Sequence, residues 1–280
     1  MSRVDPTSVD ETLPGVVARR TIRWSKAERS QIADSVAEEV PVAMRYNDVP
    51  FSVLMATPSD LEDLALGFSL TEGLIADTSE LIGVEVSPFI EGVEIHIRVT
   101  STAPAASLSA NSSRALPGRS GCGLCGARLL EDVMRLTPPI GRRSTFPVAS
   151  LRLALSSLPR MQPMNLATGS IHAAAWVEPD GRITHVREDV GRHNALDKLV
   201  GGLRRASIST EAGLVLLSSR ASYEMVSKAA HAGMAVVAAV SAPTALAIDL
   251  ANAAGICLIG FARRDRFNVY SHPDRLLGFD

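Results

Sequence analysis

Hydrophobic and polar residues alternate with a period of two in several short stretches, which is the pattern of half-buried β-strands. Between residues 93 and 99, Val and Ile alternate with Glu, His and Arg, so one face of this strand is expected to be buried. Residues 40–44 and 51–55 predict two more strands, joined by a turn at Asn47-Asp48. These strands predict a small sheet in the first third of the chain.

A helix is predicted between these strands. Ser59 and Glu62 have the spacing of a capping box, and apolar residues follow on one face. They are Leu61, Leu64, Ala65, Phe68 and Leu74. Residues 34–100 are therefore interpreted as a small α/β domain. The preceding residues 1–33 are polar and rich in Arg, without clear periodicity, and are interpreted as a tail or an edge segment.

The last part of the chain, residues 151–280, alternates strand and helix patterns. Strands are predicted at 171–177, 183–186, 214–217, 235–240 and 256–261, and helices at 192–203, 223–232 and 243–254. Alternation of this kind predicts a mixed or mostly parallel sheet with helices on its faces. Between the two domains, residues 101–150 lose hydrophobic periodicity and are interpreted as a flexible connection. This connection carries Cys122-Gly-Leu-Cys125, with glycine on both sides.

Composition narrows the classes of function. The chain has 280 residues, 46% of them hydrophobic and 21% charged, with a formal net charge of −2. That charge disfavours nucleic acid and anionic membranes as partners, because both attract a surplus of Lys and Arg. No apolar run is long enough to cross a bilayer and no secretory signal is evident, so we expect a cytoplasmic protein. The basic residues are almost all Arg, which fits either composition bias or phosphate recognition.

The cysteine pair has several interpretations. Three cysteines do not make a disulfide framework. A structural zinc site needs about four ligands, and only Cys257 and six scattered histidines remain to complete one. The deaminase arrangement of His-x-Glu before Pro-Cys-x-x-Cys is also absent. A thioredoxin-like redox pair lacks the strand that should precede it. A nucleophilic thiol in an exposed loop, or two inert surface cysteines, are the other interpretations.

Polar residues follow three predicted strands of the last domain. They are Ser218-Ser219-Arg220, Ser241-Ala242-Pro243 and Arg263-Arg264-Asp265-Arg266. Helix capping accounts for the second, and a solvated surface accounts for the third. Because ligands of α/β sheets gather at the carboxyl ends of strands, the three together predict a phosphate site for a nucleotide-bearing ligand.

Other polar residues allow both structural and catalytic interpretations. His172 lies in an apolar strand, where a structural role is the more common one. Glu188 and Asp189 fit either a general acid–base pair or a solvated turn, and Asp197 and Lys198 are interpreted as surface or interface charges.

Several of these segments together resemble one family, the formate dehydrogenase accessory sulfurtransferases (FdhD). The matching segments are residues 38–42, 65–68, 121–126, 172–176, 188–199, 218–226 and 260–270. The resemblance implies a cytidine-deaminase-like core without zinc, built as a mixed sheet with helices on both faces, plus a smaller N-terminal α/β unit. It also implies transfer of sulfur from a cysteine desulfurase to the molybdenum or tungsten cofactor of formate dehydrogenase by a homodimer.

The resemblance also implies site residues. The persulfide position falls on Cys122 and the second cysteine on Cys125. The site for bis-molybdopterin guanine dinucleotide, for which GDP is a mimic, falls on Phe261, Ala262, Arg263, Arg264, Asp265 and Arg266. No permanently bound cofactor or metal is expected. Arg264 and Ser170 depart from the residues common in the family. A cofactor chaperone without sulfur transfer and a zinc deaminase relative stay open as alternatives.

Overall fold

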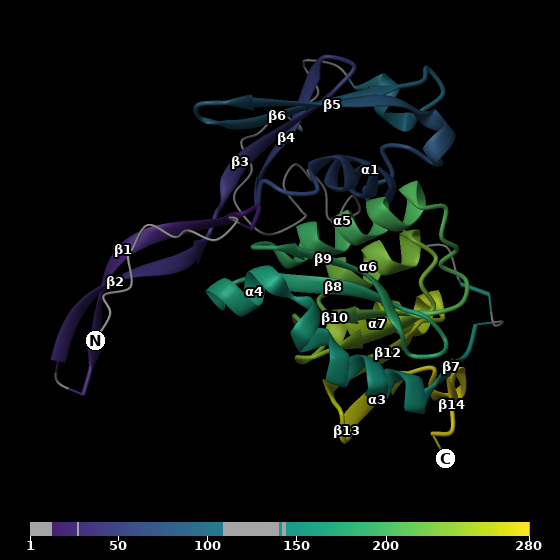
Figure 1. The fold of residues 1–280 in the computed structure, drawn as a ribbon. Helices are drawn as coiled ribbons and strands as arrows, with labels where there is room; N and C mark the ends of the chain where they lie inside the picture. The colour runs from purple at the N-terminus through teal and green to yellow at the C-terminus, as the bar shows by residue number, and fades with distance from the viewer. Residues whose placement is uncertain (1–12, 27, 109–139, 142–143, 280) are drawn as a thin grey trace.

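The computed structural model describes residues 13–26, 28–108, 140–141 and 144–279. Figure 1 shows three parts in chain order: a two-stranded ribbon that projects from the molecule, a small sheet, and a larger unit that contains most of the buried residues. We call these parts the ribbon, the small unit and the core unit.

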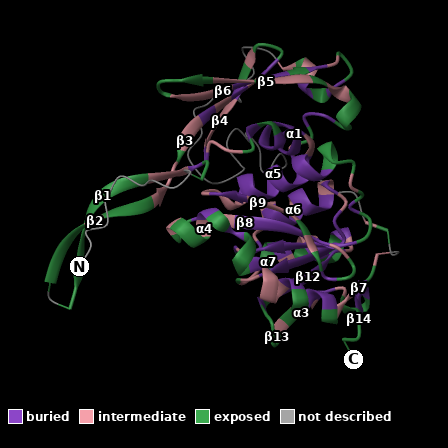
Figure 2. Ribbon diagram, in the orientation of Figure 1, coloured by how far each residue is buried: buried purple, intermediate pink, exposed green. Residues whose placement is uncertain are grey.

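The ribbon consists of the antiparallel strands β1 (Val16–Ser25) and β2 (Glu28–Ala37). Its side chains are mostly exposed, as the green colour in Figure 2 shows, and Trp24 is 71% exposed. For the described part of residues 1–33, the interpretation as a tail is therefore wrong, and the alternative of an edge segment fits the two strands. The sequence of the ribbon does not alternate between hydrophobic and polar residues, because the ribbon has no core against which one face could pack. Its β-branched and aromatic residues nevertheless favour strands.

The small unit is a sheet in the order β4-β3-β6-β5, covered by helix α1 (Leu61–Thr71). Its strands are β3 (Val40–Tyr46), β4 (Val49–Ala56), β5 (Leu81–Phe89) and β6 (Gly92–Val99). Asn47 and Asp48 both have positive φ and form the predicted hairpin turn. The predicted capping box is wrong, because Asp60 is the N-cap residue and its side chain makes no capping bond.

The core unit is built on a mixed sheet, which we call the core sheet. Among the described residues its strand order is β13-β12-β11-β10-β8-β9. The strands are β8 (His172–Val177), β9 (Ile183–Asp189), β10 (Leu214–Leu217), β11 (Val236–Ala239), β12 (Cys257–Arg263) and β13 (Arg266–Ser271). Strands β10, β11 and β12 are parallel, and the other pairings are antiparallel.

Helices cover both faces of the core sheet, which confirms the expected fold class. Val215 and Leu217 pack with α5 (Arg192–Arg205), α6 (Tyr223–His231) and α7 (Ala245–Ala254). Leu214 and Leu216 point to the other face, toward α3 (Val148–Ser157). Helix α7 begins two residues later than predicted, because Thr244 is its N-cap and accepts a bond from the Ala247 N–H.

Short elements complete the described fold. They are α4 (Pro163–Thr168), the paired strands β7 (Phe146–Pro147) and β14 (Leu276–Leu277), and the 3-10 helices Thr78–Glu80, Pro104–Ser107, Leu158–Met161 and Pro273–Arg275. None of the helices in the described segments is long and apolar enough to cross a membrane.

The small unit and the core unit meet where α1 packs on α5. Glycines permit close backbone contact at this crossing. A Cβ on Gly67 would lie 1.7 Å from the carbonyl oxygen of Asp197, and one on Gly201 would lie 1.9 Å from that of Asp63. No side chain fits at either position, so the two units approach through their backbones.

Candidate functional site

The predicted sulfur-carrying residues, Cys122 and Cys125, lie outside the described residues. The chain is described again at Ile140 and Gly141, whose carbonyl oxygens accept hydrogen bonds from the buried Arg275 at 3.2 and 2.9 Å. The same guanidinium donates to the carbonyl oxygens of Ser144 and Gly255. Arg275 therefore holds Ile140, Gly141 and Ser144 against the core unit, beside the beginning of β12.

The predicted cofactor residues 261–266 form a strand end and a turn rather than a loop. Phe261 to Arg263 belong to β12, and Arg264 and Asp265 form the turn into β13, which Arg266 begins. Ala262 is buried in the core, so only its backbone can face a ligand. The side chains of Arg263, Arg264, Asp265 and Arg266 are exposed.

Phe261 has an unusual conformation for a residue in a strand. Its φ is 51°, in the left-handed region that bulky residues rarely adopt, and its side chain is 47% exposed. The register of β12 against β13 shifts at this point. The Phe261 N–H donates to the carbonyl oxygen of Ser241 at 3.1 Å. Strain of this kind in an exposed aromatic residue is a feature of ligand sites.

The arginines differ in their contacts. Arg263 donates from Nη1 to the carbonyl oxygens of Val240 at 2.5 Å and Ala262 at 2.8 Å. Its guanidinium is thus held beside the carboxyl end of β11. Arg264 accepts a bond on its carbonyl oxygen from Arg152 Nε at 3.0 Å, which anchors the turn to α3.

The three predicted strand-end segments do come together at one edge of the core sheet. The N–H of Ser241 donates to the carbonyl oxygen of Ser219 at 3.2 Å, and the carbonyl oxygen of Ser241 accepts from Phe261. The N–H of Val240 donates to Leu217. This edge, formed by the carboxyl ends of β10, β11 and β12, is where ligands of α/β sheets bind. We call it the carboxyl edge.

His172 also lies at the carboxyl edge, on the side of β10 away from β11. Strand β8 runs antiparallel to β10, so the beginning of β8 lies beside the carboxyl end of β10. Ser218 links the two strands, since its Oγ accepts a bond from the Ala173 N–H at 2.8 Å. The His172 side chain is half-buried. Burial, followed by the positive charges of Arg192 and His193, lowers the pKa of His172.

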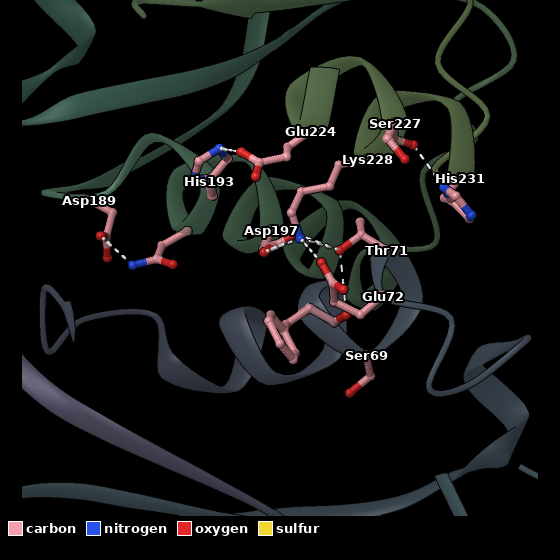
Figure 3. A network of polar contacts seen from close by, with 12 residues as sticks. Ser69, Thr71, Glu72, Asp189, His193, Asp197, Glu224, Ser227, Lys228 and His231 are labelled. Carbon is pink, nitrogen blue, oxygen red and sulfur yellow. Dashed lines mark hydrogen bonds and ion pairs between the residues drawn. The ribbon is translucent and has the colours of Figure 1, made fainter. Parts of the chain in front are cut away.

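His193 and Glu224 form an ion pair, with 2.6 Å between Nε2 and the carboxylate (Figure 3). They come from the first turns of α5 and α6. Burial opposes the charge of Glu224, but the contact with His193 outweighs it and lowers the pKa of the Glu224 carboxyl. The pair connects the beginnings of two helices at the carboxyl edge.

Neither Glu188 nor Asp189 lies in a solvated turn. Both are buried at the end of β9. Glu188 accepts bonds from the backbone N–H groups of Met164 and Asn165 at the beginning of α4. Asp189 accepts from the N–H groups of Thr57 and Gly191 and from Asn194 Nδ2, and it pairs with Lys198 Nζ at 2.7 Å. Both oxygens of the Asp189 carboxylate are thus engaged in contacts within the chain.

Asp197 and Lys198 are buried where the two units meet, so of the two interpretations the surface one is wrong and the residues lie at an interface within the chain. Figure 3 shows Lys228 of α6 at the centre of a network with Asp197 of α5 and with Thr71 and Glu72 from the end of α1. The Lys228 Nζ lies 2.9–3.0 Å from oxygens of all three residues. Burial opposes the charge of Lys228, yet the carboxylates of Asp197 and Glu72 outweigh it and raise its pKa.

Within the described ranges, no group of three or more His, Cys, Asp or Glu side chains could hold a metal ion. Cys257 is buried in β12, and this burial raises the pKa of its thiol to about 12. Burial and a raised pKa both disfavour the reactive thiolate form of Cys257.

The fold and the carboxyl edge define the class of this molecule, a two-unit α/β protein whose core sheet brings Ser- and Arg-bearing strand ends together at one edge. Residues 37–277 match the FdhD/NarQ family, and the chain belongs to that family. The sulfur carrier protein FdhD of Xanthomonas euvesicatoria pv. vesicatoria (strain 85-10) is 49% identical over 263 residues, which cover 94% of this chain and 93% of the relative.

Two further proteins are similar to this chain, one in sequence and one in fold. The sulfur carrier protein FdhD of Bordetella petrii is 47% identical over 244 residues, or 87% of each chain. The crystal structure of a candidate formate dehydrogenase accessory protein from Desulfotalea psychrophila matches with a TM-score of 0.77 and 24% identity. It covers 94% of this chain and all of the other, and it shows that the two share a fold.

Sequence reasoning missed the His193–Glu224 pair and the network around Lys228. Their partners lie 31 residues apart in each case, and Thr71 lies 157 residues from Lys228. One signal was present in the sequence. Lys198 and Lys228 are two of only three lysines among many arginines, and both are buried.

Proposed function

We propose that this chain is a sulfur carrier that serves formate dehydrogenase. Cys122 accepts sulfur from the persulfide of a cysteine desulfurase and passes it to the bis-molybdopterin guanine dinucleotide cofactor. The observation that carries the proposal is the glycine-flanked Cys122-Gly-Leu-Cys125 in a chain of this family, whose relatives are described as sulfur carrier proteins. The exposed aromatic and arginine residues of the carboxyl edge support the step in which sulfur passes to the cofactor.

The transfer is a sequence of thiol exchanges. The Cys122 thiolate attacks the outer sulfur of the donor persulfide, an S–S bond forms on Cys122, and the donor leaves as a thiolate. The Cys125 thiolate then attacks the Cys122 sulfur, which forms a disulfide and releases hydrosulfide to the acceptor. A cellular dithiol, or two thiol molecules in turn, reduces that disulfide, is itself oxidised to a disulfide and restores both cysteines of the carrier. No metal is needed in the protein for either step.

The cofactor is the acceptor substrate in this proposal, and it binds transiently at residues 261–266. Phe261 stacks on the guanine base, and the arginines at 263 and 266 contact phosphate as charge-assisted donors. Ala262 contributes only its backbone. The fixed position of the Arg263 guanidinium beside Val240 favours this role, because less side-chain freedom is lost on binding.

The proposal also includes partners and place. The carrier works as a homodimer in the cytoplasm, and it docks in turn with the desulfurase and with formate dehydrogenase. The alternative is a chaperone that binds the cofactor and carries no sulfur.

The test is the intact mass of the purified chain after incubation with a cysteine desulfurase and cysteine. The chain should gain about 32 Da, the mass of one sulfur added to a thiolate. Cys122→Ala should lose this adduct, and it should also lose the ability to activate formate dehydrogenase. Cys257→Ala is the matched control and should keep both, because that thiol is buried with a raised pKa.

Three outcomes would count against the proposal. An undiminished adduct in Cys122→Ala would show that another residue carries the sulfur. Cofactor binding without any adduct in the unmodified chain would favour the chaperone. Near-equimolar zinc that is lost in Cys125→Ser would favour the deaminase relative.

A further inference from the structure

We propose that the ribbon is an interaction surface for a second copy of this chain. One face of the ribbon docks on the hairpin of β5 and β6 in the other copy, and the ribbon of the other copy docks in the same way in return. The inference rests on the proposed homodimer and assigns the two surfaces that meet in it.

One face of the ribbon carries basic and apolar side chains without a carboxylate. Successive residues of a strand point to opposite faces, and residues opposite each other in an antiparallel pair share a face. Trp24 lies opposite Arg29, and Ile22 and Arg20 lie on the same face of β1. We call these four residues the ribbon patch, and all four are exposed. The rest of this face carries no charge and consists of Val16, Ala18, Gln31, Ala33, Ser35 and Ala37.

The opposite face of the ribbon has mixed charge. Arg19 lies opposite Asp34 on this face, which also carries Arg23 and Glu28. The positive charges of this face are balanced by carboxylates, whereas those of the ribbon patch are not. A partner surface that is acidic and partly apolar therefore fits the ribbon patch and not the opposite face.

The hairpin of β5 and β6 carries the complementary combination of side chains. Glu85 and Phe89 lie four residues apart on β5 and therefore on one face, and Ile90 and Glu91 form the turn that follows. We call these four residues the hairpin patch, and all four are exposed. Residues 81–92 contain no basic residue, so the hairpin patch is acidic as well as apolar.

The apolar side chains of both patches are uncovered within one chain. In the described part of the molecule, five of the six most exposed large hydrophobic side chains lie on β1, on β5 or in the turn after β5. Figure 1 shows the ribbon well separated from β5 and β6, so neither patch covers the other within one chain. Exposed apolar side chains that gather in this way mark an interaction site.

The distribution of charge favours a second copy as the partner. Residues 16–37 contain five basic and two acidic side chains, a formal charge of 5 − 2 = +3, and the whole chain carries −2, so the other residues carry −2 − 3 = −5. The ribbon of one copy is therefore attracted to the rest of another copy. Two copies related by a twofold axis make the contact twice and cover both ribbon patches and both hairpin patches. The contact also stabilises the ribbon, because an isolated two-stranded hairpin is only marginally stable in water.

The experiment is sedimentation equilibrium of the full chain and of two charge-reversed variants. Arg20→Glu/Arg29→Glu makes the ribbon patch acidic, and Glu85→Arg/Glu91→Arg makes the hairpin patch basic. In each variant like charges meet, so the dissociation constant of the dimer should rise about tenfold or more. In an equimolar mixture of the two variants, both contacts of a heterodimer join opposite charges again. The mixture should therefore associate about as tightly as the unmodified chain.

Two more variants complete the design. Arg19→Glu/Arg23→Glu is the matched control, because it makes the same change of charge on the opposite face of the ribbon. This control should leave the dissociation constant unchanged. Trp24→Ala should weaken the dimer by roughly thirtyfold, as loss of an aromatic anchor does at the centre of an interface.

The outcomes separate this inference from the proposed function. Dimers that persist in both charge-reversed variants, or a mixture that fails to associate, would overturn the two patches as the interface and leave the proposed homodimer in place. An unmodified chain that is monomeric at every concentration would overturn the homodimer as well. The gain of sulfur on Cys122 is measured separately, and it should be the same in every variant.

Discussion

Removal of Lys228 should destabilise the protein more than any exposed substitution. Lys228→Met leaves the Asp197 carboxylate buried without its cation, and it removes the Nζ bonds to Thr71 and Glu72. Loss of one partner from a buried ion pair costs about 3–5 kcal/mol of unfolding free energy. In a chain of this size that corresponds to a Tm lower by roughly 6–20 °C, at about 2–4 °C per kcal/mol.

Urea unfolding followed by circular dichroism measures the loss directly. Lys26→Met is the matched control, because Lys26 is exposed on the ribbon, and its midpoint should equal that of the unmodified chain. If the cost comes from the uncompensated carboxylate, Asp197→Asn introduced into Lys228→Met should recover part of the stability. A loss below about 1 kcal/mol in Lys228→Met would refute the argument that this network joins the two units.

Gly67→Ala should lower the unfolding free energy in urea by about 1–3 kcal/mol or more, because its Cβ would lie 1.7 Å from the Asp197 carbonyl oxygen. Gly83→Ala is the control and should be nearly neutral, because its Cβ would meet only the end of the Arg98 side chain at 3.4 Å. The contact with His193 lowers the pKa of the Glu224 carboxyl below its ordinary value of 4.5. The ionised carboxylate therefore stabilises the fold at a pH above 4.5, and this stabilisation is lost as the pH falls below that value. The unfolding free energy of Glu224→Gln should therefore depend less on pH between 5 and 3, and an equal dependence would contradict the pair.

The regular elements of the fold could be predicted where burial repeats along the sequence. The strand at residues 93–99 and the helix that begins at Arg192 follow from periods of two and 3.6, because each packs one face on a core. The ribbon could not be predicted in this way, since it buries neither face. The capping box failed because Asp60 adopts a left-handed conformation that no local sequence rule requires.

The candidate site could be predicted in part. Strand ends rich in Ser and Arg indicated the carboxyl edge, because the position of parallel strand ends follows from topology. The conformation of Phe261 and the pairing of His193 with Glu224 depend on contacts between distant segments. Charged residues on a predicted helix are also expected to face solvent. Asp197 and Lys198 are exceptions, because the small unit covers them.

The buried lysines explain how the two units are held together around the site. Of the 28 basic residues, three are lysines, so 28 − 3 = 25 are arginines, and two of the three lysines lie at the contact between the units. A single ammonium group directs three donors from one atom into a small space, which a planar guanidinium cannot do. Lys198 uses this geometry to join Asp189 to the Thr57 carbonyl oxygen of the small unit. Asp189 of β9 lies opposite His172 of β8 in the register of the core sheet. Through Lys198, the small unit therefore contributes to the position of the carboxyl edge.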